Sequence, residues 1–273
     1  MNRKKRSTNR TLRPVNYNAG NIIWYQRELL SVIRAMNNDV RSEIVKIIRD
    51  NPLASDSALM ANDANPIVFI RQAIAALSKR WVDRFINMAM PTAETITNKT
   101  GEAVDRSLLS AARKDSMNIN MQWTEAMLEK REAIISENVS LIRSIPEKYF
   151  TDVESMVYRA VAKGGDRKGL ADEIEANFGK RHGITRRRAE FIARDQVRNA
   201  TSDLSNARQQ AAGIKRGIWL HSGGGNEPRP KHVHANGLEF DLDKGLPIGD
   251  KGQYVLPGKE PGCGCTWKPV LPF

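Results

Sequence analysis

The segment from Ile218 to Phe273 constrains the fold more than any other part of this sequence. It holds three of the four histidines, both cysteines and most of the glycines and prolines that form turns. Because it is poor in large apolar residues, we expect it to build little core by itself. Small modules of this kind are commonly held by a bound metal or a disulfide.

The two cysteines favour a metal over a disulfide. Cys263 and Cys265 are one residue apart, which strains a bond between them, and no third cysteine exists. The glycine between them allows a tight turn that presents both thiolates to one point. Zinc binds such thiolates together with imidazole nitrogens in a four-coordinate site. We therefore predict a structural zinc site.

His232 is the expected third ligand of this site. His234 lies two residues on and points the same way in an extended segment, so it is the expected fourth ligand. The reserve ligands are His221, Asp241 and Asp243. The spacing matches no standard zinc finger, and it leaves a second interpretation open: two reduced, packed thiols and two surface histidines.

The charge of the chain indicates an anionic partner. In 273 residues the formal net charge is +12 and the isoelectric point is about 9.8. Nucleic acid and acidic protein surfaces both fit this charge. The first basic cluster is an expected arm on phosphate or in an acidic groove, or else a solubilising tail; it contains Arg3, Lys4, Lys5 and Arg6. The second cluster is an expected phosphate-facing strip, or else a solvated helix face; it contains Arg186, Arg187, Arg188, Arg194 and Arg198.

The same composition argues against a membrane protein. No apolar run approaches the length of a membrane span, and the N-terminus lacks the apolar core of a signal peptide. Two closely spaced cysteines are typical of a reducing compartment rather than of a secreted disulfide scaffold. We expect a soluble protein made in a cytoplasm.

Helical periodicity dominates the first three quarters of the chain. Apolar residues recur every three or four positions over 21–50 and again from Pro66, and Pro91 is expected to end or kink the second helix. A further helix is expected over 121–145, closed by Pro146. Three shorter helices are then predicted over 147–162, 167–178 and 185–212, with glycines as their C-caps.

After Gly213 the pattern changes to short strands. Strands are predicted over 214–220, 238–242, 254–256 and 266–270, joined by long loops into a small antiparallel sheet. The fold class is therefore α+β and predominantly helical, with long N-terminal helices before a helical domain and a small β module. The predicted parts are a basic flexible arm (1–20), a helical docking region (21–120) and a C-terminal domain (121–273), whose helices cover 121–212 and whose β module covers 214–273.

The C-terminal half resembles the phage Mu F-like minor head proteins, the phage head-morphogenesis family. The matching features are a helix that ends in Ala-Gly before a strand carrying Trp219, then Arg229-Pro230-Lys231-His232, then Asn236-Gly237, and finally Cys263-Gly264-Cys265. The resemblance covers about residues 130–273 and implies a cluster of His232 with both cysteines. Gly264 departs from the family's pattern, which has arginine between the cysteines.

The resemblance implies a non-enzymatic virion component, assembled in the host cytoplasm and located inside the head near the portal. Its expected partners are the portal or major capsid protein and packaged double-stranded DNA, bound without sequence preference. The alternative is a metal-dependent, HNH-like nuclease that uses His232, His234 and Asn236. A third hypothesis, a zinc-ribbon regulator, lacks a Cys-x-x-Cys pair and a recognisable reading helix.

Overall fold

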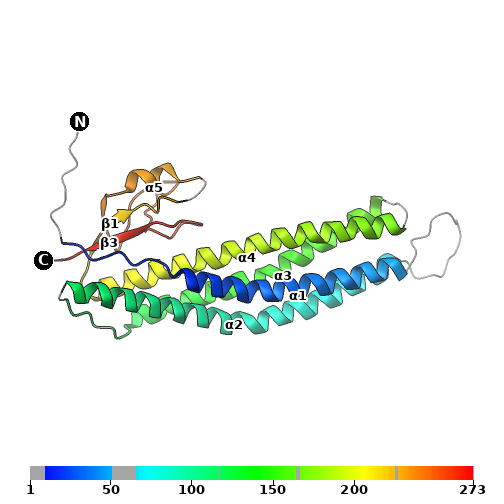
Figure 1. The fold of residues 1–273 in the computed structure, drawn as a ribbon, viewed down its shortest axis with the longest axis horizontal. Helices are drawn as coiled ribbons and strands as arrows, with labels where there is room; N and C mark the ends of the chain where they lie inside the picture. The colour runs from blue at the N-terminus through cyan, green and yellow to red at the C-terminus, as the bar shows by residue number, and fades with distance from the viewer. Residues whose placement is uncertain (1–9, 51–65, 116, 164–166, 225–226, 273) are drawn as a thin grey trace. The chain divides into compact units, whose positions relative to one another are not determined.

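The computed structural model of this chain describes residues 10–50, 66–115, 117–163, 167–224 and 227–272. Of these residues 70% are helical, and they form four long helices and a three-stranded antiparallel sheet (Figure 1). The predicted fold class is therefore confirmed. The long helices are α1 (Ala19–Asp50), α2 (Pro66–Lys114), α3 (Glu125–Lys163) and α4 (Arg167–Ala211); the remaining elements are β1 (Arg216–Leu220), α5 (Pro230–Ala235), β2 (Glu239–Asp241) and β3 (Thr266–Val270).

Two predicted helix ends are wrong, because Pro146 lies inside α3 and α4 continues through Gly179. Pro91 lies inside α2 and does not end that helix, so the predicted alternative, a kink, stays a prediction. An interior proline removes one backbone hydrogen bond and costs about 3 kcal/mol. Here the helices bury apolar residues on both sides of each proline, such as Ala89 and Ala93 around Pro91. Tertiary packing thus overrides the local preference of proline and glycine.

The contacts divide the chain into two units. The sheet unit contains Met1–Ile23, Glu94–Ser136 and Ala193–Phe273, and the helical unit contains Trp24–Ala93 and Glu137–Ile192. Each long helix contributes residues to both units. This division differs from the predicted segments 1–20, 21–120 and 121–273, because residues far apart in sequence pack together.

The helical unit is a four-helix bundle with an apolar core. Two buried polar pairs join α1 to α3: the Tyr25 hydroxyl donates to Oδ1 of Asn138 at 2.9 Å, and the Tyr149 hydroxyl donates to Oδ1 of Asn37 at 3.1 Å. Burial raises the pKa of both tyrosines, so both hydroxyls stay protonated and act as donors. Because each buried partner needs the other, the pairs specify the register of α1 against α3.

The sheet unit contains the sheet in the order β2-β1-β3, with both pairings antiparallel. The N-terminal segment continues this sheet, since Thr11 bridges to Val270 and the Leu12 N–H donates to the carbonyl of Pro269. Leu12 and Val15 are buried. The expected flexible arm is therefore wrong for residues 10–15, whereas Arg3, Lys4, Lys5 and Arg6 lie outside the described residues. The strand predicted over 254–256 is reduced to an isolated bridge between Leu246 and Val255.

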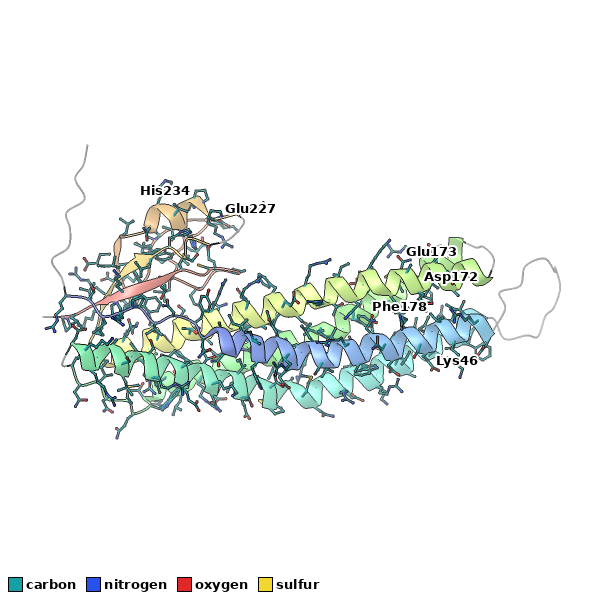
Figure 2. The ribbon with its side chains drawn as sticks, viewed as in Figure 1. Lys46, Asp172, Glu173, Phe178, Glu227 and His234 are labelled. Atoms are coloured by element: carbon teal, nitrogen blue, oxygen red, sulfur yellow. The ribbon has the colours of Figure 1, made fainter. Side chains whose placement is uncertain are left out.

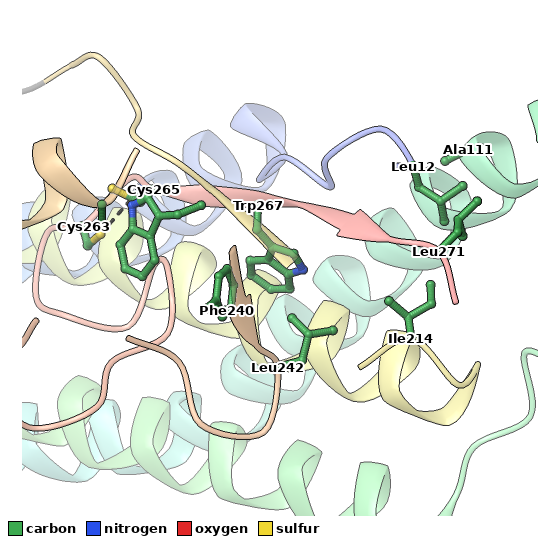
Figure 3. Packing of buried hydrophobic residues seen from close by; sticks show 11 residues of the cluster. Leu12, Ala111, Ile214, Phe240, Leu242, Cys263, Cys265, Trp267 and Leu271 are labelled. Atoms are coloured by element: carbon green, nitrogen blue, oxygen red, sulfur yellow. Dashed lines mark hydrogen bonds between the residues drawn. The ribbon is translucent and has the colours of Figure 1, made fainter. Parts of the chain in front are cut away.

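The sheet unit has a larger core than its C-terminal segment predicts. Trp219, Phe240 and Trp267 pack edge to face, and both cysteines belong to the same buried cluster (Figure 3). Gly217 makes this packing possible, because a Cβ there would lie 2.6 Å from Cδ1 of Trp267. Leu12 and Ala111 complete the cluster from distant parts of the chain. The expectation of little core missed these long-range contributions.

Candidate metal centre

The segment that carries the two central histidines is a short helix, not an extended strand. Pro230 is the first residue of α5, a position at which its missing N–H costs nothing. Residues two apart on a helix do not share a face. His232 is accordingly buried, whereas His234 is exposed on the outer side of α5 (Figure 2). The prediction of His234 as fourth ligand is therefore wrong, because it assumed an extended segment.

The structure brings His232 to both cysteines. Nδ1 of His232 lies 3.5 Å from Sγ of Cys263 and 3.8 Å from Sγ of Cys265. The candidate ligand atoms of the three residues lie within 4.8 Å of one another, and all three side chains are buried. Among the described residues, the reserve ligands His221, Asp241 and Asp243 do not join this group.

The second nitrogen of His232 faces a carboxylate. Its Nε2 lies 2.8 Å from Oε2 of Glu260, although the carboxylate is off the direction of a well-aligned hydrogen bond. Glu260 also pairs with Arg229, whose Nε is 3.3 Å from the same oxygen, and Arg229 donates to the carbonyl of Pro261. A carboxylate on the far nitrogen is the usual partner of a metal-binding histidine, because it fixes the orientation of the ring.

The hydrogen bond between the two thiols shifts their pKa values in opposite directions. The pKa of Cys263 is lowered, chiefly by the hydrogen bond from the Cys265 thiol and also by the backbone N–H groups of Cys265 and Gly258 and by His232, while burial opposes this effect. The pKa of Cys265 is raised, because its thiol donates to Cys263 and because it is buried. The backbone hydrogen bond from Ser222 lowers the pKa of Cys265 and so opposes this rise.

These residues suit a metal ion. Two sulfurs and one imidazole nitrogen form a common donor set for zinc, and thiolates are the form that binds metal. Backbone N–H groups around the sulfurs favour that thiolate form, and the carboxylate of Glu260 supports the histidine. The group of His232, Cys263 and Cys265 can therefore hold a metal ion.

The remaining residues of the predicted motif support this centre. Trp219 is buried in β1, and the centre of its ring lies 5.3 Å from the centre of the His232 ring in an edge-to-face contact. Gly237 adopts a left-handed φ of 82° in the turn between α5 and β2. Asn236, just before it, accepts a hydrogen bond from the backbone of His221. The motif therefore builds the frame in which His232 is held.

Polar residues of α4, which the sequence patterns did not single out, anchor the module. Ser202 donates to the carbonyl of Pro257, Asn206 donates to the carbonyl of Leu242, and Gln209 accepts from the indole of Trp267. All three α4 side chains are buried. The many uncharged polar residues of α4 were the available sequence signal for this contact. Buried polar side chains need hydrogen-bond partners, and the backbone of another segment can supply them.

The predicted arginines of α4 lie in different environments. Arg186 pairs with Glu190, and Arg188 donates to Ser144 within the helical unit. Arg187 and Arg194 are exposed. Arg198 lies in the sheet unit and donates to the carbonyl of Gly262. A phosphate-facing role for these arginines stays a prediction.

The segment that builds this centre matches a known family. Residues 151–268 match the family described as Phage Mu protein F like protein. This segment is similar to the Mu F-like family. It begins in α3 and ends in β3, so the Mu F-like segment contains all three candidate ligands. The resemblance seen in the sequence is thereby confirmed, and it supports a phage head protein and a virion component.

A bacterial relative covers nearly the whole chain. An uncharacterized protein of Haemophilus influenzae is 28% identical over 279 residues, which make up 99% of this chain and 57% of the relative. This chain thus spans little more than half of that relative's length. No solved structure gives a significant match. In the described part of the chain, no helix is long and apolar enough to cross a membrane.

Proposed function

We propose that this chain is a structural minor head protein of a phage, located inside the head near the portal, where it assists head assembly and DNA packaging or ejection. The observation that carries this proposal is the Mu F-like match over the segment in which His232, Cys263 and Cys265 converge. The motif residues have structural roles in this geometry: Trp219 packs on His232, and Arg229 holds the loop before the cysteines.

The test of this role is the location of the protein in assembled particles. Cross-linking of purified particles, followed by mass spectrometry, should link this chain to the portal or major capsid protein. Absence of the chain from particles both before and after DNA packaging would contradict the proposal. Recovery of the chain only from particles before packaging would restrict its role to assembly.

We further propose zinc as the ion held by His232, Cys263 and Cys265. When bound, it would cross-link α5 to the loop before β3, and it would add stability to a small module. Reduced, purified protein should contain about one zinc per chain. Glu260→Gln should weaken zinc binding about 10-fold, because the carboxylate no longer supports the His232 ring. Glu239→Gln is the matched control, since Glu239 pairs with Arg216 rather than with the histidine.

The nuclease hypothesis lacks support from the geometry. His232 faces the cysteines, His234 is exposed, and the Asn236 side chain accepts a backbone hydrogen bond, so the three do not converge on one point. We expect no cleavage of DNA with magnesium, manganese or zinc. Reproducible cleavage that disappears in His232→Ala would instead favour the nuclease.

Double-stranded DNA, bound without sequence preference, is the proposed second partner. The net charge of +12 supports it, and Arg3, Lys4, Lys5 and Arg6 supply the densest run of positive charge. Binding should weaken steeply with salt, and replacing these four residues by glutamine should reduce the slope of log K against log salt by about 0.9 for each phosphate that the variant no longer neutralises. A second variant, in which Arg186, Arg187 and Arg188 are replaced by glutamine, tests the α4 cluster in the same way. Tight binding to one sequence in high salt would contradict the proposal.

A further inference from the structure

The loop that carries the cysteines is held by α4 at Gly262, the residue just before Cys263. The N–H of Gly262 donates to Oδ1 of Asp195 at 2.6 Å, and the carbonyl of Gly262 accepts from Nη1 of Arg198 at 3.2 Å. Asp195 is only 9% exposed. The two side chains are three residues apart and therefore lie on one face of α4. One helix thus satisfies both polar groups of a single residue in the loop.

Gly262 needs partners of this kind. Its φ of 74° lies in the left-handed region, where glycine is favoured, and a glycine there has wide conformational freedom. Hydrogen bonds to ionised groups are about twice as strong as neutral ones. The orientation of this residue sets the direction in which the next residue, Cys263, projects its sulfur toward His232. A carboxylate and a guanidinium together restrict that direction.

Arg198 also connects the loop to the N-terminal segment. Its Nη2 lies 3.3 Å from the hydroxyl of Tyr17, and its Cζ lies 4.7 Å from the centre of the Tyr17 ring. A Cβ built on Gly264 would lie 3.6 Å from the same Cζ. This geometry gives Arg198 a role other than the phosphate contact that its sequence context predicted.

We infer that Asp195 and Arg198 are positioning residues for the pair of cysteines, which they hold in the arrangement that faces His232. The effect on zinc binding rests on the proposed function. The effect on the position and reactivity of the two thiols does not require a bound metal. The hydrogen bonds at Gly262 involve none of the candidate ligand atoms, so they restrict the loop independently of a metal ion. A loop that is ordered in advance lowers the cost of ordering the thiols on binding.

The test uses Arg198→Met and Asp195→Ala in the full chain, with circular dichroism to check helix content. Two quantities are measured: zinc affinity by competition with a chelator, and the rate at which the thiols of metal-free protein react with a disulfide reagent. Zinc affinity should fall about 10-fold in each variant, and the thiols should react faster. Asp195→Asn keeps an acceptor oxygen and should restore part of both properties. Arg113→Met, an exposed arginine of the same unit, is the matched control and should change neither.

The outcomes separate this inference from the zinc proposal. Folded variants with wild-type zinc affinity and wild-type thiol rates would overturn the positioning role while leaving zinc in place. Wild-type protein that binds no zinc would overturn the zinc proposal, and the thiol rates alone would then decide the positioning role. If Arg198→Met or Asp195→Ala fails to fold, the smaller changes Arg198→Lys and Asp195→Asn decide by the same two measurements.

Discussion

The helical unit and the sheet unit are stabilised by different kinds of contact. In the helical unit, apolar stripes along four helices form the core, and Tyr25 and Tyr149 each add one buried hydrogen bond. In the sheet unit, short strands are joined by aromatic packing, by polar side chains of α4 bonded to loop backbone, and by the group of His232 with the two cysteines. Periodic burial suffices for long helices, whereas a module with short elements needs specific contacts between distant segments.

The largest expected effect is a loss of zinc and of protease resistance in the sheet unit, while the helical unit stays protected. His232→Ala or Cys263→Ser should abolish zinc binding, because each removes a ligand, and should expose the module after Gly213 to protease. The helical unit contains none of these ligands, so its fragments should stay protected. Metal analysis and limited proteolysis with mass spectrometry measure both effects. A chelator should reproduce the pattern in wild-type protein.

His234→Ala is the matched control for this experiment. His234 is exposed and lies outside the ligand group, so zinc content and protease resistance should stay at wild-type values. Equal loss of zinc in His234→Ala and His232→Ala would show that the histidines act together and would contradict the assignment. Uniform loss of protection in both units of His232→Ala would contradict the contrast between them.

A smaller effect is expected from Gly217→Ala in the core of the sheet unit. The new methyl group would lie 2.6 Å from Cδ1 of Trp267, so Trp267 and Phe240 must shift. Overpacking of this kind costs about 1–3 kcal/mol. Urea unfolding followed by tryptophan fluorescence measures the cost. Gly224→Ala is the control, since a Cβ there meets no atom within 4 Å; equal stability of the two variants would contradict the packing argument.

The smallest expected effect concerns the helical unit. Tyr149→Phe removes the donor to Asn37, and a typical hydrogen bond contributes about 1 kcal/mol to stability, the lower end of the cost expected for Gly217→Ala. Zinc content should not change. Unfolding in urea, followed by circular dichroism, gives the difference. Tyr158→Phe serves as control because the Tyr158 hydroxyl accepts an exposed hydrogen bond from Arg71; a larger destabilisation in that control would contradict the role of the buried pairs.

Much of the fold follows from local patterns in the sequence. The apolar periodicity of α1 and the turn residues around β1, β2 and β3 predicted these elements close to their observed positions. The unbroken length of α2 and α3 did not follow from local signals, because burial on both sides outweighs the cost of Pro91 and Pro146. Propensity is a weak local term, and tertiary burial exceeds it.

The candidate site divides in the same way. Residue chemistry and spacing, together with the family resemblance, indicated that His232 belongs with Cys263 and Cys265. The wrong choice of His234 came from assuming an extended segment, since only the helical turn of α5 separates the two histidines. Glu260 and Asp195 left no such signal, because their partners are side chains and backbone groups far away in the sequence.

The sequence by itself determined the helical character of this protein and its basic charge, because these depend on residue type and on short-range periodicity, and it indicated that His232 belongs with the two cysteines. Only the tertiary structure decided which side of α5 faces the sulfurs, how the N-terminal segment extends the sheet and which residues of α4 hold the loop. Those features depend on contacts between residues that are far apart in the chain, and chain folding alone brings them within bonding distance.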